Sequence, residues 1–192
     1  MDEYKGLPVL AFETQVAWRE WLDGHHQESS GLWLRIFKKA SGHPTVTYAE
    51  ALDEALCYGW IDSTKAAGDA DSFLQRFSPR KSRSIWSKVN REHVARLIVA
   101  GKMQPAGLAV IEAAKANGQW DAAYDSASSM VLPAEFQAAL DAHPEAKAFF
   151  ESLNKTNQYA FYHRIHTAKR PETRTKKVAW ALDMLLRKEK LH

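Results

Sequence analysis

The 192-residue chain has little cysteine, little net charge and no long apolar run, and these shortages limit what it can be. A single cysteine cannot form a disulfide within the chain, so a domain held together by disulfides is excluded. The formal net charge of +3 gives no strong indication of an anionic or cationic partner. Because no stretch reaches the roughly 18 consecutive apolar residues of a spanning helix, we expect no integral membrane association.

The amino-terminal residues lack the features of an export signal. The stretch MDEYKGLPVLAFET is acidic where a secretory signal is basic and has a longer apolar run. Together with the lone thiol, this predicts a reduced, cytoplasmic protein. The composition that is present, 45% hydrophobic and 11% aromatic residues, argues against disorder and suffices for one domain or two small ones.

Charge is distributed unevenly along the chain. Lys and Arg minus Asp and Glu gives −6 for residues 1–74, +7 for 75–102, −5 for 103–153 and +7 for 154–192. Two basic blocks therefore alternate with two acidic ones, which the small net charge conceals. Both basic blocks are candidate binding surfaces.

The first part of the chain carries the signals of a small sheet. Apolar or alternating runs predict strands at residues 9–12, 31–39, 60–65 and 72–78. The polar turn AAGDAD between the last two predicts a hairpin. Its aspartates give only a weak signal for a metal site, because residues rich in Gly and Asp are more often a turn, and we expect no metal and no cofactor.

Helix signals separate and follow these strands. Thr47 and Glu50 have the spacing of a capping box, which predicts a helix that ends near Gly59. Ser84 is the candidate cap of a later helix that stops at Gly101.

From Leu132 onward every stretch looks helical. We therefore expect an α+β fold, with a small antiparallel sheet packed with helices over residues 1–131 and a helical carboxyl-terminal unit over residues 132–192.

The lone Cys57 lies in the stretch EALCYGWIDS, near a predicted helix end. A nucleophilic thiol needs a cation, a base or a helix amino terminus to lower its pKa, whereas the dipole at a helix carboxyl terminus opposes a thiolate. We therefore interpret Cys57 as a small buried side chain. In this interpretation Trp60 and Asp62, which follow it, are free to line a site.

The segment RFSPRKSRSIWSKVN is the strongest candidate site in the sequence. Its cations alternate with aromatic and hydroxyl side chains where a helix is predicted to begin, an arrangement that favours an anion. Together with the two preceding residues, the predicted ligand-binding set is Trp60, Asp62, Arg76, Arg80, Lys81, Arg83, Ser84, Trp86 and Lys88. The alternative is a solvated basic turn whose serines only cap the helix.

The last helix presents a second basic surface. Cations recur at helical spacing opposite an apolar stripe, which predicts an amphipathic helix. Its candidate partner-binding residues are Lys169, Arg170, Arg174 and Lys177. Such a face suits nucleic acid, an acidic protein or a membrane surface, or it is simply solvated.

Five stretches of the chain resemble the bacteriocin-protection family that is also called YdeI or OmpD-associated (OmdA), namely FETQVAWREWLDGHH, GLWLRIFKKASG, TYAEALDEALCYGWIDS, RFSPRKSRSIWSKVN and AKRPETRTKKVAWALDML. The resemblance covers nearly the whole chain, and the block from about Leu132 resembles the named domain. It implies a link to bacteriocin tolerance and envelope stress, without a catalytic mechanism to carry over. The family name suggests an outer-membrane association. This sequence departs from that suggestion, because its first residues do not resemble an export signal.

Three functions stay open on these observations. The first is a cytoplasmic stress or protection protein that binds a phosphorylated or otherwise anionic small molecule at the basic aromatic segment. The second is a module that binds nucleic acid or an acidic protein with both basic blocks. The third is an enzyme that uses Asp62, Cys57 or Tyr58 with Arg80. Because no motif supplies a nucleophile, a base and an orienting group together, we expect binding rather than catalysis.

Overall fold

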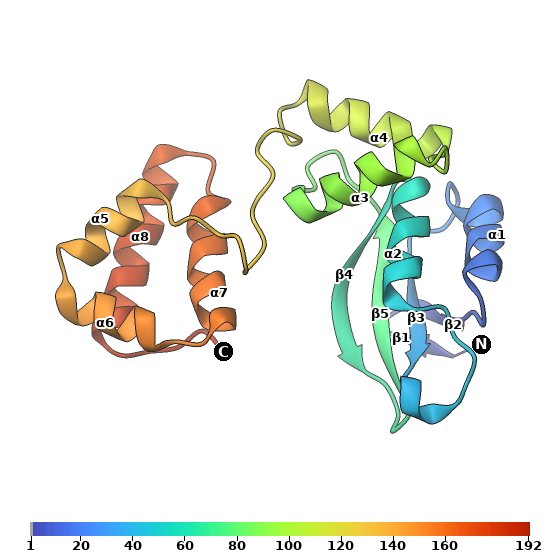
Figure 1. The fold of residues 1–192 in the computed structure, drawn as a ribbon, viewed down its shortest axis with the longest axis horizontal. Coiled ribbons are helices and arrows are strands. Elements are labelled where there is room, and N and C mark those ends of the chain that lie inside the picture. Colours follow the sequence, from blue (N-terminus) through green and yellow to red (C-terminus); the bar gives the residue numbers. More distant parts are fainter. Residues whose placement is uncertain (1) are drawn as a thin grey trace. The chain divides into compact units, whose positions relative to one another are not determined.

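The computed structural model describes residues 2–192, which fold into two compact units. The first unit runs up to Ile85 and resumes over Asn90–Ala122, and the second contains Trp86–Val89 and Ala123–His192 (Figure 1). No described helix is long and apolar enough to cross a membrane. The boundary expected after residue 131 stays a prediction.

The first unit is built on a five-stranded sheet with the order β1-β2-β3-β5-β4. Its strands are β1 (Glu3–Tyr4), β2 (Leu7–Ala11), β3 (Leu32–Phe37), β4 (Trp60–Ala67) and β5 (Ser72–Pro79). Three of the four pairings are antiparallel, and β2 pairs with β3 in parallel. The predicted α+β class and the β4–β5 hairpin are confirmed. The sheet is mixed because the helix between β2 and β3 returns the chain in the same direction.

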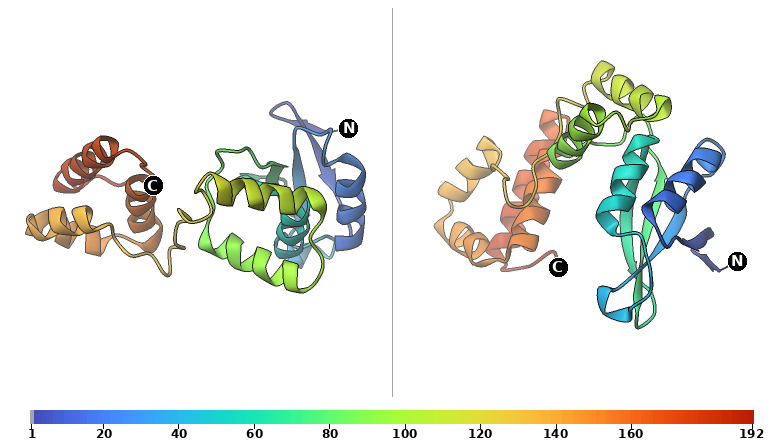
Figure 2. Two further views of the ribbon diagram at one scale, coloured as in Figure 1. Left: turned by 90° about the horizontal axis from the view of Figure 1, so that it is seen from above. Right: turned by 45° about the vertical axis from the view of Figure 1, so that its right-hand side comes forward.

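Helices α1 (Gln15–His25) and α2 (Tyr48–Cys57) cover one face of this sheet (Figure 2). The indole of Trp18 in α1 donates to the Ala51 carbonyl of α2 at 3.0 Å, and its ring lies 5.7 Å from that of Phe77 in β5. Trp18 and Phe77 are fully buried, so the core of the unit lies between these helices and the sheet. Helices α3 (Lys88–Val99) and α4 (Pro105–Ala116) follow the sheet in the chain.

The two ends of α2 are formed by the residues that the sequence predicted. The Thr47 hydroxyl accepts from the Glu50 N–H at 3.3 Å, and the Glu50 carboxylate accepts from the Thr47 N–H at 2.9 Å, which completes the capping box. After the helix, Gly59 has a φ of +74°, a conformation that favours glycine. A Cβ at this position would lie 2.9 Å from a Val110 methyl group of α4.

Helix α3 begins later than the sequence predicted, at Lys88 rather than after Ser84. Ser84 closes a turn instead, because its N–H donates to the Lys81 carbonyl and its hydroxyl accepts from the Lys81 N–H. The next residues are extended, and Ser87 forms a parallel bridge with Tyr124. The bridge partner is far along the chain, so local helix signals could not reveal it.

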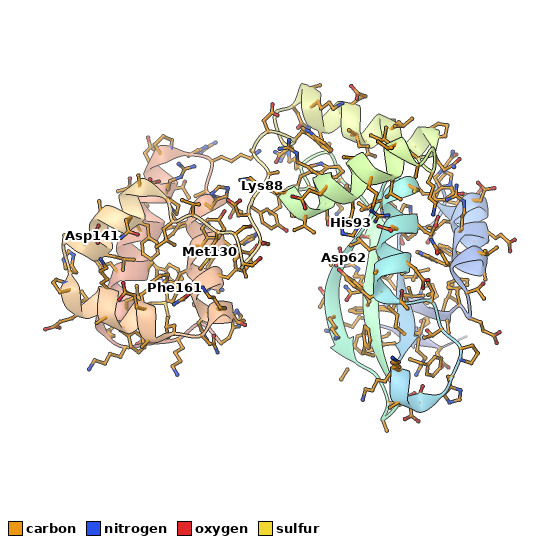
Figure 3. The ribbon with its side chains drawn as sticks, in the orientation of Figure 1. Asp62, Lys88, His93, Met130, Asp141 and Phe161 are labelled. Carbon is orange, nitrogen blue, oxygen red and sulfur yellow. The ribbon has the colours of Figure 1, made fainter. Side chains whose placement is uncertain are left out.

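The second unit contains four helices, α5 (Ala134–Asp141), α6 (Pro144–Ser152), α7 (Lys155–His166) and α8 (Pro171–Leu186). Figure 3 shows Phe161 of α7 directed into the space between these helices. The apolar core of the second unit consists of Phe136, Leu140, Ala146, Phe150, Leu153, Phe161, Ile165, Ala181 and Leu185. The expected helical carboxyl-terminal unit is therefore confirmed.

Candidate functional site

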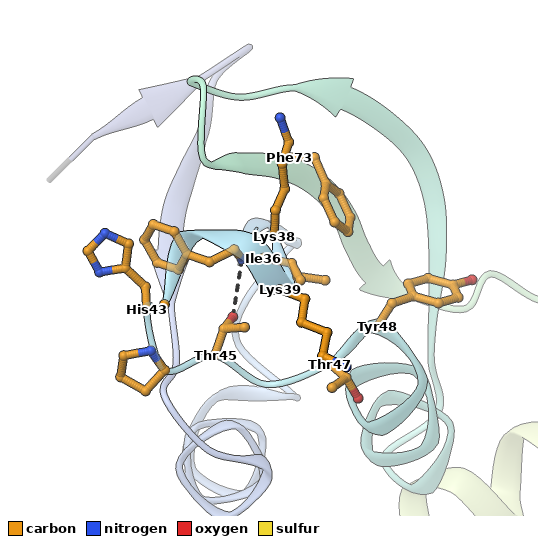
Figure 4. A pocket seen from close by; sticks show the side chains of 11 residues that line it. Ile36, Lys38, Lys39, His43, Thr45, Thr47, Tyr48 and Phe73 are labelled. Carbon is orange, nitrogen blue, oxygen red and sulfur yellow. Dashed lines mark hydrogen bonds between the residues drawn. The ribbon is translucent and has the colours of Figure 1, made fainter.

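A pocket of about 830 Å³ opens in the first unit where strand β3 ends (Figure 4). Its walls come from the end of β3, the loop that leads into α2, the first residues of α2 and strand β5. The lining residues are Ile36, Phe37, Lys38, Lys39, Gly42, His43, Pro44, Thr45, Thr47, Tyr48 and Phe73. The volume falls in the range of sites for small molecules.

The loop of the pocket is held in place by its own polar groups. A short 3-10 turn over Lys39–Ser41 follows β3, and Gly42 then reverses the chain with a φ of +73°. The Thr45 hydroxyl accepts from the Phe37 N–H at 3.3 Å, the bond drawn in Figure 4, which ties the loop back to the strand. The loop ends at the capping box of α2, so both ends of the pocket wall are fixed.

Apolar side chains form the floor of the pocket. Ile36 of β3 and Phe73 of β5 are cross-strand partners, and Tyr48 adds a ring from the first turn of α2. On the opposite side the Phe37 and His43 rings lie 4.8 Å apart. These rings offer an apolar body somewhere to pack.

The ionisable side chains that line the pocket at its rim are basic. Lys38, Lys39 and His43 are exposed at its rim, and none of the eleven lining residues is acidic. Lys38 is oriented by a 2.7 Å bond from its ammonium group to the Ala70 carbonyl. A further lysine, Lys65, lies with its ammonium 4.0 Å from the centre of the Phe73 ring.

Two carboxylates accept hydrogen bonds from side chains that line the pocket. Glu50 accepts from the Thr47 N–H and hydroxyl, and these bonds hold the pKa of the Glu50 carboxyl below its usual value. Asp62 accepts from the Tyr48 hydroxyl at 2.8 Å. No lining residue therefore brings a carboxylate that would compete with an anion for Lys38 and Lys39.

Trp60 and Asp62, the first residues of the predicted ligand-binding set, lie on β4. The Trp60 indole is buried and donates to the His26 carbonyl at 3.0 Å, so it belongs to the core. Asp62 faces the helices, where it meets Tyr48 beside the pocket; Figure 3 labels its position.

The two arginines of the set that follow differ in orientation and burial. Asp62 pairs with Phe77 across the hairpin, so Arg76, one residue earlier on β5, points to the opposite face of the sheet. Arg80 is 9% exposed and donates to the Ile85 carbonyl at 3.1 Å, which stabilises the turn that follows β5. The structure therefore does not bring Asp62 and Arg76 to one face.

Lys81 and Arg83 are exposed at the turn that Ser84 closes. The remaining two residues of the set, Trp86 and Lys88, belong to the second unit. Trp86 is 2% exposed, and Lys88 forms a 2.6 Å ion pair with Asp125. The set predicted from the sequence thus divides into core residues, turn residues, one ion pair and two strand residues on opposite faces of the sheet, and its joint role stays a prediction.

Asp125 is the centre of a polar cluster in the second unit. Besides the Lys88 ammonium, its carboxylate accepts from the Tyr162 hydroxyl at 3.1 Å, while its backbone carbonyl accepts from the Tyr159 hydroxyl at 3.1 Å. Burial raises the pKa of the Asp125 carboxyl, but the bonds from Lys88 and Tyr162 outweigh it and lower the pKa overall. Burial also raises the pKa of Tyr162 to about 12.

The candidate partner-binding residues lie at the start of α8. Lys169 and Arg170 are exposed in the turn before the helix, and Lys177 is half-buried. Arg174 donates to the Ala168 carbonyl and lies 3.4 Å from the Glu135 carboxylate, so it helps to hold the helical unit together. Arg174 thus has a structural partner, and the others stay candidates for a partner surface.

Cys57 is fully buried in the last turn of α2, as its position in the sequence predicted. Burial, followed by the neighbouring carboxylate of Glu54, raises the pKa of the thiol to about 11. The thiol is therefore protonated at neutral pH and a poor nucleophile. Among residues 2–192, no group of three or more His, Cys, Asp or Glu side chains is arranged to hold a metal ion.

The basic residues of the pocket were not predicted from the sequence. Lys38, Lys39 and His43 stand between a predicted strand and a predicted capping box, and a basic loop in that position is itself a signal for an anion site. What was not visible is the β3–β5 register, which sets Phe73 beside Ile36 and so supplies the floor.

Two family models match this chain. A domain of unknown function, DUF8412, matches residues 10–110, which is more than half of the chain and includes the whole pocket. The OmdA model, described as bacteriocin-protection, YdeI or OmpD-associated, matches residues 129–188. No curated protein and no solved structure matched. The resemblance to OmdA is thus confirmed for the helical unit, whereas the amino-terminal stretches fall in the other model: the chain belongs to the DUF8412 family and carries a carboxyl-terminal OmdA domain.

Proposed function

We propose that the first unit binds a small anionic ligand with an apolar body in the pocket at the end of β3. The observation that carries this proposal is the lining itself, which combines an apolar floor with three basic side chains and no acidic one. The OmdA domain supports a protective role, which this chain would exert as a binding protein. The expectation of an anionic ligand is kept and is proposed here for the pocket, while the ligand-binding set expected at residues 60–88 stays a prediction.

The two parts of the pocket indicate the class of ligand. Phe73, Ile36 and Tyr48 would pack against a ring or an acyl chain. Lys39 and His43, together with the oriented Lys38, would meet a carboxylate, sulfonate or phosphate group at the rim. A ligand with only one of these two features would bind more weakly.

Fluorescent probes test both features at once. Anilinonaphthalene sulfonate carries an aromatic body and an anionic group, and phenylnaphthylamine is nearly the same body without the charge. We expect the double variant Lys38→Gln/Lys39→Gln to bind the sulfonate about fivefold to tenfold more weakly, since two exposed charge contacts are worth about 1 kcal/mol. Binding of the neutral probe should change little.

Two further variants serve as controls for this experiment. Phe73→Ala removes part of the floor and should weaken both probes. Lys81→Gln removes an exposed lysine outside the pocket and should weaken neither. Equal losses of the sulfonate in Lys81→Gln and in the double variant would show that the probe reads general surface charge, and the proposal would be wrong.

A second candidate is a surface that binds nucleic acid or an acidic protein. In the first unit such a surface would include Lys81 and Arg83, and in the second unit Lys169 and Arg170. These four cations are exposed, and their side chains form no ion pair within the described residues. Many phosphate contacts give a steep loss of affinity with salt, whereas a pocket ligand gives a shallow one. The salt dependence of binding therefore separates the two candidates.

A further inference from the structure

The sheet has a second face, opposite α1 and α2, that carries an unusual pair of side chains. Side chains alternate between the two faces of a strand, and Phe77 faces the helices through its contact with Trp18. Arg76 and its cross-strand partner Trp33 of β3 therefore point to the opposite face.

Both members of this pair have a buried donor without a partner. The Trp33 indole Nε1 and the Arg76 Nε are buried and form no hydrogen bond. Trp33 as a whole is 3% exposed. An unpaired buried donor destabilises a fold, so two on directly opposed residues call for an explanation.

The positive charge of Arg76 has no partner either. No hydrogen bond, ion pair or ring contact of the Arg76 guanidinium occurs among the described residues, and its two Nη nitrogens stay accessible. By contrast, Arg35, also on this face, binds Asp69 at 2.7 Å and lies 3.7 Å from Asp2. The missing group at Arg76 is thus an acceptor, preferably one with negative charge.

We propose that Arg76 and Trp33 form a binding site for an oxyanion, a carboxylate or a phosphate group, on the face of the sheet opposite α1 and α2. One oxygen would accept from the Trp33 indole and another from the Arg76 guanidinium, whose planar fork matches two oxygens. Tyr4 borders the site, since its ring meets Trp33 edge-on at 4.9 Å, and the Lys5 ammonium lies 5.4 Å from the Tyr4 ring. This site is separate from the pocket and does not depend on it.

Proton–nitrogen NMR spectra of the full chain test the site directly. The seven tryptophans give seven indole N–H signals, and the Trp33→Phe variant identifies the one from Trp33. We expect a saturable shift of this signal when sodium phosphate or sodium acetate replaces sodium chloride at constant ionic strength. The anion that saturates the shift at the lower concentration shows whether the site prefers a phosphate or a carboxylate group.

Variants of Arg76 make the test decisive. Arg76→Gln should abolish the shift, Arg76→Lys should weaken binding at least severalfold because the fork is lost, and Lys102→Gln, at an exposed lysine outside every proposed site, should leave the shift unchanged. If Trp33→Phe does not fold, backbone assignment of the wild-type chain identifies the same signal. A Trp33 signal that does not respond to either anion, or that responds equally in Arg76→Gln, would overturn the proposal and indicate that ordered water satisfies the two donors.

Discussion

The pocket of the first unit and the Asp125 cluster of the second use charged side chains in opposite ways. Around Asp125, the ammonium of Lys88 and the hydroxyl of Tyr162 both donate to one carboxylate. In the pocket, Lys39 and His43 meet no lining carboxylate at all. The comparison teaches that a charge with a built-in partner supports the fold, whereas a charge left without one is free to bind a ligand.

Removing the Asp125 carboxylate should have the largest effect on stability of the changes considered for these two regions. We expect Asp125→Ala to lower the free energy of unfolding by about 3 kcal/mol, because Lys88 and the buried Tyr162 hydroxyl lose their acceptor. Urea unfolding followed by circular dichroism measures the loss. Binding of the fluorescent sulfonate under native conditions should not change.

Asp141 provides the matched control for that variant. Its carboxylate also accepts from a lysine, Lys147 at 2.8 Å, but it is half exposed. Asp141→Ala should therefore cost less than about 1 kcal/mol. If the two variants lost the same stability, the Asp125 cluster would be no more than another surface ion pair.

A related contrast, between close packing and open space, exists around α2. Its first turn borders the open pocket, while its last turn packs against α4. Gly59→Ala combines a left-handed φ with a 2.9 Å approach to Val110 and a 3.1 Å approach to the Ala106 carbonyl. Gly101→Ala meets a φ of +65° with nothing within 4 Å. We expect Gly59→Ala to be the more destabilising by about 1–2 kcal/mol in thermal or urea unfolding. If the two variants lost the same stability, α4 would move aside at no cost and the close approach to Val110 would not matter.

The smallest expected effect concerns pH. Burial lowers the pKa of His163 and of His166, both on α7 of the second unit. Because the unfolded chain then binds protons more readily, stability is complete above about pH 6.5 and declines as the pH falls below it. The urea midpoint should be lower at about pH 5.5 than at about pH 7.5.

Replacing both histidines by glutamine should flatten this decline. The carboxyl of Asp125 does not interfere, because its lowered pKa places its own contribution to acid unfolding below about pH 4. A pH dependence that persisted unchanged in the double variant would assign the decline to other groups.

Local signals in the sequence were sufficient for much of the fold. The capping box of Thr47 and Glu50, the helix end at Gly59 and the hairpin of β4 and β5 all depend on neighbouring residues, and all were predicted. The parallel pairing of β2 with β3 was not, because the direction of a pairing depends on the path of the connecting helix. Likewise the start of α3 depends on the bridge between Ser87 and Tyr124, and no residue near Ser87 in the sequence indicates that bridge.

The candidate sites were harder to predict for the same reason. Each requires residues that strand pairing brings together, Phe73 with Ile36 in the pocket and Arg76 with Trp33 on the other face. Arg76 was singled out from a basic run, but burial and cross-strand register distinguish it from Lys81 and Arg83. Sequence composition located the charge, and only the register of the sheet shows which charges lack a partner.

The capping box has a consequence for selectivity. With the Glu50 carboxylate at the start of α2, the positive end of that helix is already neutralised, so an anion in the pocket would be recognised by Lys38 and Lys39 instead of by fixed backbone amides. An ammonium group on a flexible stem adapts to carboxylates, sulfonates and phosphates of different outline. If the proposed ligand binds here, the pocket would therefore select compounds by charge and bulk and would accept a broad class of them.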